Sequence, residues 1–156
     1  MRMDAEEITT RVLDSREGQS SADSKAQAAL QGLACYLWGR PESEDSRFAR
    51  ASFRLPGRAE RTAALVWPHH TGARWEWHAL LRLSDGTEVA GASSETVDEL
   101  MHLWVAWMCV DAKSGRLTAA QRLELLDAAD WMRSTPAAER LGVCFDDVDS
   151  IRLVGA

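Results

Sequence analysis

The segment from Glu95 to Val110 is apolar on almost every side of a helix. After its acidic first turn, only His102, Ala106 and Cys109 interrupt the large apolar residues. A surface helix instead carries one apolar stripe that repeats every 3.6 residues. About eleven apolar residues are also too few to cross a bilayer, which takes roughly twenty. The pattern therefore predicts a central buried helix, with Ser94 as its N-cap.

The first forty residues predict an N-terminal arm and one helix. Residues 1–20 carry only a weak apolar stripe, so we assign them to an arm. The next stripe predicts a helix from Lys25 to Trp38, which Gly39 is suited to end. Residues 21–156 are expected to form a single domain, because a chain of 156 residues has the usual size of one domain.

A third helix is predicted over residues 118–133. Thr118 and Gln121 have the spacing of a capping box, in which each side chain bonds the backbone N–H of the other residue. Leu123, Leu126 and Trp131 are expected to face the core.

Between the helix that ends at Trp38 and the central helix, apolar and polar residues alternate with the period of two that is typical of a strand. The clearest case is the stretch in which Trp75 and Trp77 fall on one side and Arg74 and His78 on the other. A hairpin turn is predicted at Ser84-Asp85-Gly86-Thr87. The four predicted strands are Arg47–Leu55, Thr62–Trp67, Arg74–Leu83 and Thr87–Ala90.

Together these elements predict an α+β fold: an N-terminal helix, a four-stranded antiparallel meander sheet, then two helices packed on one sheet face. Leu141–Phe145 and Ile151–Val154 are expected to be two further short strands. The predicted core contacts join the central helix to the third strand, through Leu100, Trp104, Met108, Trp75, Trp77 and Leu81. A helix with so many apolar sides needs cover from the flanking helices, and a homodimer is the alternative that would supply it.

Composition agrees with a folded domain, since 46% of the residues are hydrophobic and 27% are charged. Seven tryptophans predict a tryptophan-rich core, and a binding face is the alternative use of this residue. The three cysteines form no C-x-x-C pair, and the N-terminus has no apolar segment of the signal-peptide type. These features favour a cytoplasmic protein.

Charge is distributed unevenly along this acidic chain. The net charge is −6, yet residues 47–82 hold seven arginines and two glutamates, a net charge of +5, so the remainder carries −11. Arg50, Arg54, Arg74 and Arg82 are expected on one face of the predicted sheet. This asymmetry indicates a surface that attracts negatively charged partners, unless ion pairs within the protein consume it.

Histidine is the main candidate for chemistry. His69 and His70 lie in the predicted loop between the second and third strands, and His78 lies on the third strand near Glu76. Imidazole and carboxylate groups bind Zn²⁺ and similar metals, but this spacing matches no metal-binding motif. The sequence also lacks G-x-S-x-G, Walker A and G-x-G-x-x-G. No cofactor is expected, and a solvated histidine pair is favoured over a metal site.

These observations predict a small acidic non-enzymatic binding protein that acts by occupying a surface of another macromolecule, as inhibitors, immunity proteins and anti-defence proteins do. Another protein is the expected partner, and a membrane is not. A nucleic-acid-binding domain that uses the arginine-rich outer face of the sheet is the second hypothesis, and a histidine-dependent metal-site enzyme is the third. The candidate binding residues are Arg50, Arg54, Arg74, His78, Arg82, His69 and His70.

Overall fold

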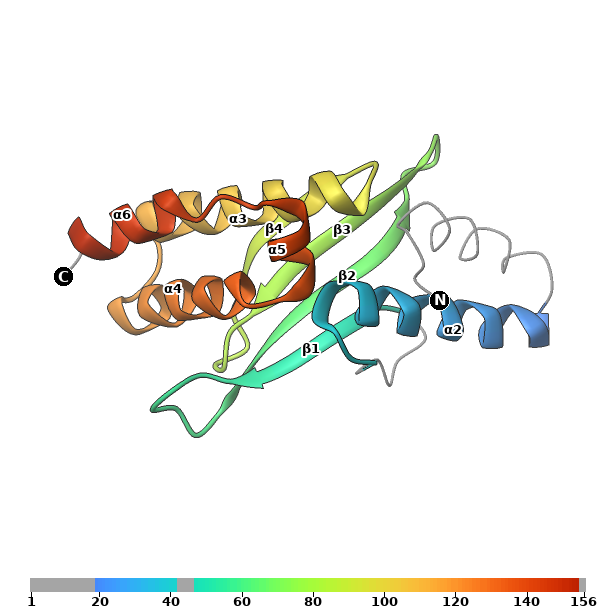
Figure 1. Cartoon of the computed structure of the whole chain (residues 1–156), viewed down its shortest axis with the longest axis horizontal. Coiled ribbons are helices and arrows are strands. Elements are labelled where there is room, and N and C mark those ends of the chain that lie inside the picture. The colour runs from blue at the N-terminus through green and yellow to red at the C-terminus, as the bar shows by residue number, and fades with distance from the viewer. Residues whose placement is uncertain (1–18, 42–46, 155–156) are drawn as a thin grey trace.

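The computed structural model describes residues 19–41 and 47–154, with the side chains of its first helix described from residue 28 onward. Residues 1–18 of the predicted arm lie outside the described residues. The helix α2 extends back to Gln19, six residues before the predicted start at Lys25. The elements are α2 (Gln19–Trp38), β1 (Ala49–Arg54), β2 (Arg61–His70), β3 (Trp75–Arg82), β4 (Glu88–Ser94), α3 (Val97–Lys113), α4 (Ala119–Arg133), α5 (Pro136–Leu141) and α6 (Asp146–Val154) (Figure 1).

The four strands form one antiparallel sheet in the order β1-β2-β3-β4, which confirms the predicted meander and the α+β fold. Ala51 of β1 lies opposite Ala64 of β2, which lies opposite Leu81 of β3. The β3–β4 hairpin closes where the backbone N–H of Leu83 donates to the Thr87 carbonyl at 2.8 Å. Gly86 supports this turn with φ of +90°, a conformation that glycine adopts without a steric penalty.

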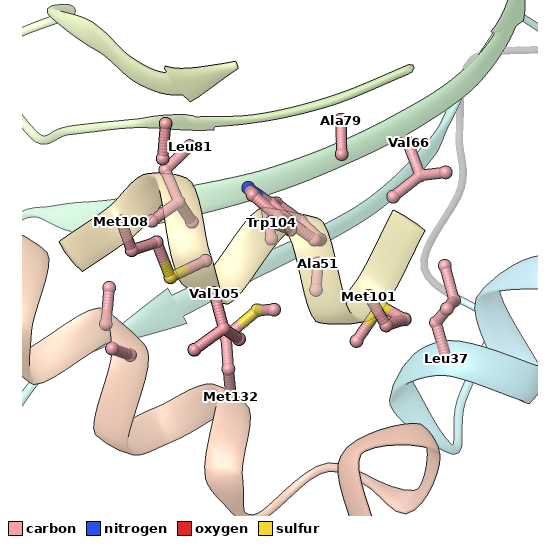
Figure 2. Packing of buried hydrophobic residues seen from close by; sticks show 14 of the residues in the cluster. Leu37, Ala51, Val66, Ala79, Leu81, Met101, Trp104, Val105, Met108 and Met132 are labelled. Carbon is pink, nitrogen blue, oxygen red and sulfur yellow. The ribbon is translucent and has the colours of Figure 1, made fainter. Parts of the chain in front are cut away.

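The described helices cover one face of the sheet, which we name the inner face. Their buried side chains form one cluster with alternate residues of the strands, such as Ala51, Val66, Ala79 and Leu81. Figure 2 shows these four residues directed toward α3 and the helices beside it. Of the predicted core residues, Trp75 is only partly buried, and the others are almost wholly buried: Leu100, Trp104, Met108, Trp77 and Leu81.

Trp104 of α3 lies in an aromatic group that joins three helices. Its ring is fully buried and meets Trp38 of α2 edge-on, with 5.9 Å between the ring centroids. Trp38 also contacts Trp131 of α4 at 5.7 Å, and Phe53 of β1 stacks on Trp131 at 3.8 Å. Three of the seven tryptophans therefore fill the space between α2, α3, α4 and β1.

The central helix differs from its prediction at its start and on one side. Thr96, not Ser94, is the N-cap, because its side chain accepts a hydrogen bond from the Glu99 N–H while Ser94 still belongs to β4. Trp107 and Val110 are each 47% exposed, so α3 keeps a solvent-facing apolar stripe. A homodimer that covers this stripe stays a prediction. No described helix is long and apolar enough to cross a membrane.

The prediction of two strands after residue 140 is wrong, because α5 ends at Leu141, residues 142–145 form a turn and an irregular connection, and Ile151–Val154 belongs to α6. Thr135 caps α5, Pro136 occupies the first helical turn, and Gly142 ends the helix with φ of +63°. These are strong local helix signals, whereas four or five alternating residues define a strand only weakly. The acidic residues Asp146, Asp147 and Asp149 form the first turn of α6, where carboxylates interact favourably with the helix dipole.

Ion pairs join α6 to α4. Arg152 of α6 bonds Asp127 at 2.9 Å and Asp130 at 2.6 Å, and Arg133 of α4 bonds Asp149 at 2.6 Å. The hydrogen bond from Arg133, aided by its positive charge, lowers the pKa of Asp149 below its ordinary value. Val148 and Ile151 of α6 are buried and belong to the core cluster.

We expect Trp104→Ala to lower the free energy of unfolding by about 3–5 kcal/mol, because it leaves a cavity at the centre of the core. Trp104→Phe should cost less, since the indole N–H is buried without a hydrogen-bond partner among the described residues. Urea denaturation followed by circular dichroism measures both values. A Trp104→Ala protein as stable as the wild type would show that this side chain is not central to the core.

Asp149→Asn should lower stability near neutral pH, with a smaller effect in acid. A carboxyl group with a lowered pKa in the folded protein stabilises it above the ordinary pKa, and this contribution disappears as pH falls through the folded value. The difference between wild type and variant should therefore shrink below about pH 4. Denaturation at several pH values tests this, with Asp147→Asn as a control in the same helical turn. A stability difference between wild type and Asp149→Asn that does not change with pH would contradict the lowered pKa of Asp149.

Candidate functional site

The described helices leave the opposite face of the sheet uncovered, and we name it the outer face. It is formed by the strand residues that alternate with those of the inner face. From β1 to β4 these are Arg50, Ser52, Arg54, Arg61, Ala63, Leu65, Trp67, His69, Glu76, His78, Leu80, Arg82, Glu88 and Ser93. The face is thus apolar in the middle, rich in arginine near β1 and rich in histidine where β2 meets β3.

Two of the four predicted arginines are paired within the protein. Arg82 bonds Glu88 on the neighbouring strand β4 at 2.9 Å. Arg74, just before β3, pairs with Glu95 and also lies 3.6 Å from Glu76. Glutamates from β3, from β4 and from the loop after β4 therefore neutralise the arginines in this part of the outer face.

The other two arginines, Arg50 and Arg54, lie on the edge strand β1. Both are exposed, and neither forms an ion pair with any residue in 19–41 or 47–154. Arg61 lies opposite Arg54 and donates a hydrogen bond to the Ser52 carbonyl at 3.2 Å. We name Arg50, Arg54 and Arg61 the arginine end of the outer face.

Apolar side chains occupy the middle of the outer face. Leu65 of β2 lies between Arg50 of β1 and Leu80 of β3 in the strand register. Leu65 is only 4% exposed although it is not part of the inner core cluster, and Leu80 and Trp67 are partly exposed. An apolar centre bordered by charged groups is the usual anatomy of a protein–protein interface.

The structure brings His69 and His78 together but not His70. The rings of His69 and His78 are 4.7 Å apart, and His78 Nε2 lies 3.3 Å from Glu76 Oε2. His70 belongs to the inner side of β2, where it contacts the ring of Trp75 at 5.1 Å, because consecutive strand residues face opposite ways. Within the described part of the chain, no group of three or more His, Cys, Asp or Glu residues could hold a metal ion.

Both edges of the sheet carry features that discourage the addition of another strand. In β4 the pairing with β3 shifts between Ala79 and Leu81, and Ala90 has φ of +55°. The carboxylate of Asp111 accepts a hydrogen bond from the Ala90 N–H at 2.6 Å and holds this irregular backbone. The other edge, β1, is short and carries Arg50 and Arg54. Bulges and charged residues of this kind protect sheet edges, so the outer face is the better candidate for binding.

Sequence reasoning missed Glu124 of α4, which is a charged residue buried in the fold. It is 4% exposed, whereas Leu123, predicted to face the core, is 49% exposed. Glu124 accepts hydrogen bonds from Thr62 Oγ1, the Ser84 N–H and Ser84 Oγ, each at 2.7 Å. Arg58 lies 3.8 Å away. One carboxylate therefore ties α4 to the β1–β2 loop, to β2 and to the turn after β3.

Comparisons with known proteins assign nothing to this site. No protein-family model, no curated protein and no solved structure matches the chain. A functional assignment therefore depends on the residues of this chain alone.

Glu124→Ala should lower the free energy of unfolding by roughly 3 kcal/mol, because it leaves buried donors without an acceptor. Asp127→Ala, which removes a more exposed carboxylate one turn away, should cost clearly less. Urea denaturation of the two variants compares them directly. Equal costs would contradict the central role that the structure gives to Glu124.

Proposed function

We propose that this protein is a non-enzymatic binding protein that occupies a surface of another protein with the outer face of its sheet. The observation that carries the proposal is the composition of that face. It combines two partly exposed apolar side chains, Leu80 and Trp67, which lie beside the buried Leu65, with an arginine end whose Arg50 and Arg54 form no ion pair among the described residues. The expected partner presents apolar side chains bordered by carboxylates. Inhibitors and immunity proteins act in this way.

A protein fits this face better than a nucleic acid does. Five arginines (Arg50, Arg54, Arg61, Arg74 and Arg82) and three glutamates (Glu76, Glu88 and Glu95) leave the outer face a net charge of only +2. Binding of a nucleic acid depends on many unpaired cations that replace its counterions. The rest of the chain is strongly acidic and would repel a long polyanion.

We further propose that the protein acts in the cytoplasm. Its three cysteines, Cys35, Cys109 and Cys144, are free thiols, and burial is the main cause that raises the pKa of Cys109. A buried thiol of this kind is a packing residue, which a reducing compartment preserves.

Charge reversal at the arginine end is the test. The tagged full-length protein is used to capture partners from its native host, and the captured protein is then purified and titrated. Arg50→Glu combined with Arg54→Glu should weaken its binding at least tenfold, because each charged hydrogen bond contributes about 1.5–3 kcal/mol. The matched control is Lys113→Glu with Arg116→Glu, two exposed cations on the helical side of the domain.

Two results would overturn the proposal. One is a captured protein whose affinity is equal for the arginine-end variant and the wild type. The other is micromolar binding of labelled oligonucleotides at about 50 mM salt that the same variant abolishes, because this would establish the nucleic-acid hypothesis instead.

A further inference from the structure

A hollow lies where the arginine end meets α4. It has a volume of about 340 Å³, and it is lined by Arg54, Leu55, Pro56, Asp127, Asp130 and Trp131. The smallest sites for small molecules have about this volume, roughly 300 Å³. Because the hollow is open to solvent, its size suits one large side chain of a partner better than a cofactor.

The walls of the hollow are held rigidly. Phe53 stacks on Trp131 with an interplanar angle of 5°, so one face of the indole is covered by the core. On the other side, Arg58 of the β1–β2 loop lies 3.8 Å from Glu124 and 4.0 Å from Asp127. The loop that contains Leu55 and Pro56 is thereby fixed to α4. A site whose walls are ordered in advance loses less entropy when it binds.

The carboxylates that line the hollow are engaged in ion pairs, whereas its lining arginine has none in the described part of the chain. Arg152 bonds both Asp127 and Asp130, and Arg133, which also bonds Asp149, lies 3.4 Å from Asp130. Arg54 is exposed and forms no ion pair within the described residues. The hollow therefore offers an apolar and aromatic surface beside one available guanidinium group.

We propose that this hollow is the anchor site for a partner segment in which an apolar or aromatic side chain is flanked by Asp or Glu. The central side chain would pack on Trp131, Leu55 and Pro56, and a flanking carboxylate would bind Arg54. Arg54 belongs both to the hollow and to the arginine end, so the anchor site is continuous with the outer face. This inference rests on the proposed function and specifies the chemistry of its partner.

Short synthetic peptides provide the test. The probe is a capped pentapeptide with Phe at its centre and two acidic residues on each side, and the controls have Ala in place of Phe or Lys in place of the acidic residues. Binding to the full chain is followed by NMR of the ¹⁵N-labelled indole N–H groups, with the Trp131 signal assigned from Trp131→Phe. We expect the Phe peptide to shift the Trp131 signal with a dissociation constant of about 1 mM or below.

Two charge-reversal variants make the test specific. Arg54→Glu should weaken peptide binding at least tenfold, whereas Arg116→Glu, on an exposed arginine after α3, should leave it unchanged. The inference is overturned if the Trp131 signal does not move at millimolar peptide, if the Ala peptide binds equally well, or if Arg54→Glu binds as the wild type does. If the peptide fails while the captured partner still depends on Arg50 and Arg54, only the anchor site is wrong. If the peptide binds but no partner depends on the arginine end, the proposed function is wrong.

Discussion

The buried carboxylate of Glu124 sets the geometry on which the candidate surface depends. Isolated in a core, such a group would carry a large desolvation cost, so it is tolerated only because three donors at 2.7 Å and Arg58 surround it. Those donors belong to β2 and to the turn after β3, and Glu124 itself belongs to α4. The contact thus fixes the sheet against α4 at the end where Arg54 and Trp131 border the hollow.

Local patterns in the sequence were sufficient for most of the fold. The alternation along Arg74–Leu83 and the Ser84-Asp85-Gly86-Thr87 turn predicted the β3–β4 hairpin, and Thr118 with Gln121 predicted the capping box that begins α4. The errors fall where the pattern is short or tertiary contacts decide. Residues 141–145 and 151–154 are too few for a period of two to be distinguished from a helical turn. The burial of Glu124 in place of Leu123 depends on donors about forty and sixty residues away.

The candidate surface was predictable only in part, for a similar reason. A period of two correctly assigns Arg50, Arg54, Arg82 and His78 to one face of the sheet. It cannot show that Glu88 and Glu95 neutralise Arg82 and Arg74, because those partners come from a different strand and from the following loop. Nor does it separate His69 from His70 until the end of β2 is known, since the strand extends to His70 and places the two rings on opposite faces.

The distribution of strain and charge in the sheet favours a face, and not an edge, as the place where a partner binds. An edge that accepted a strand would need a regular row of free backbone groups, yet β4 is irregular at Ala90 and this irregularity is held by Asp111. On the outer face β1, β2 and β3 pair in unbroken register, and the apolar residues there are bordered by side chains that carry charge. Of its arginines, Arg54 lines the hollow beside Trp131 and forms no ion pair within the described residues. Apolar and electrostatic attraction therefore coincide at one corner of the sheet, which is where a partner would gain most from both.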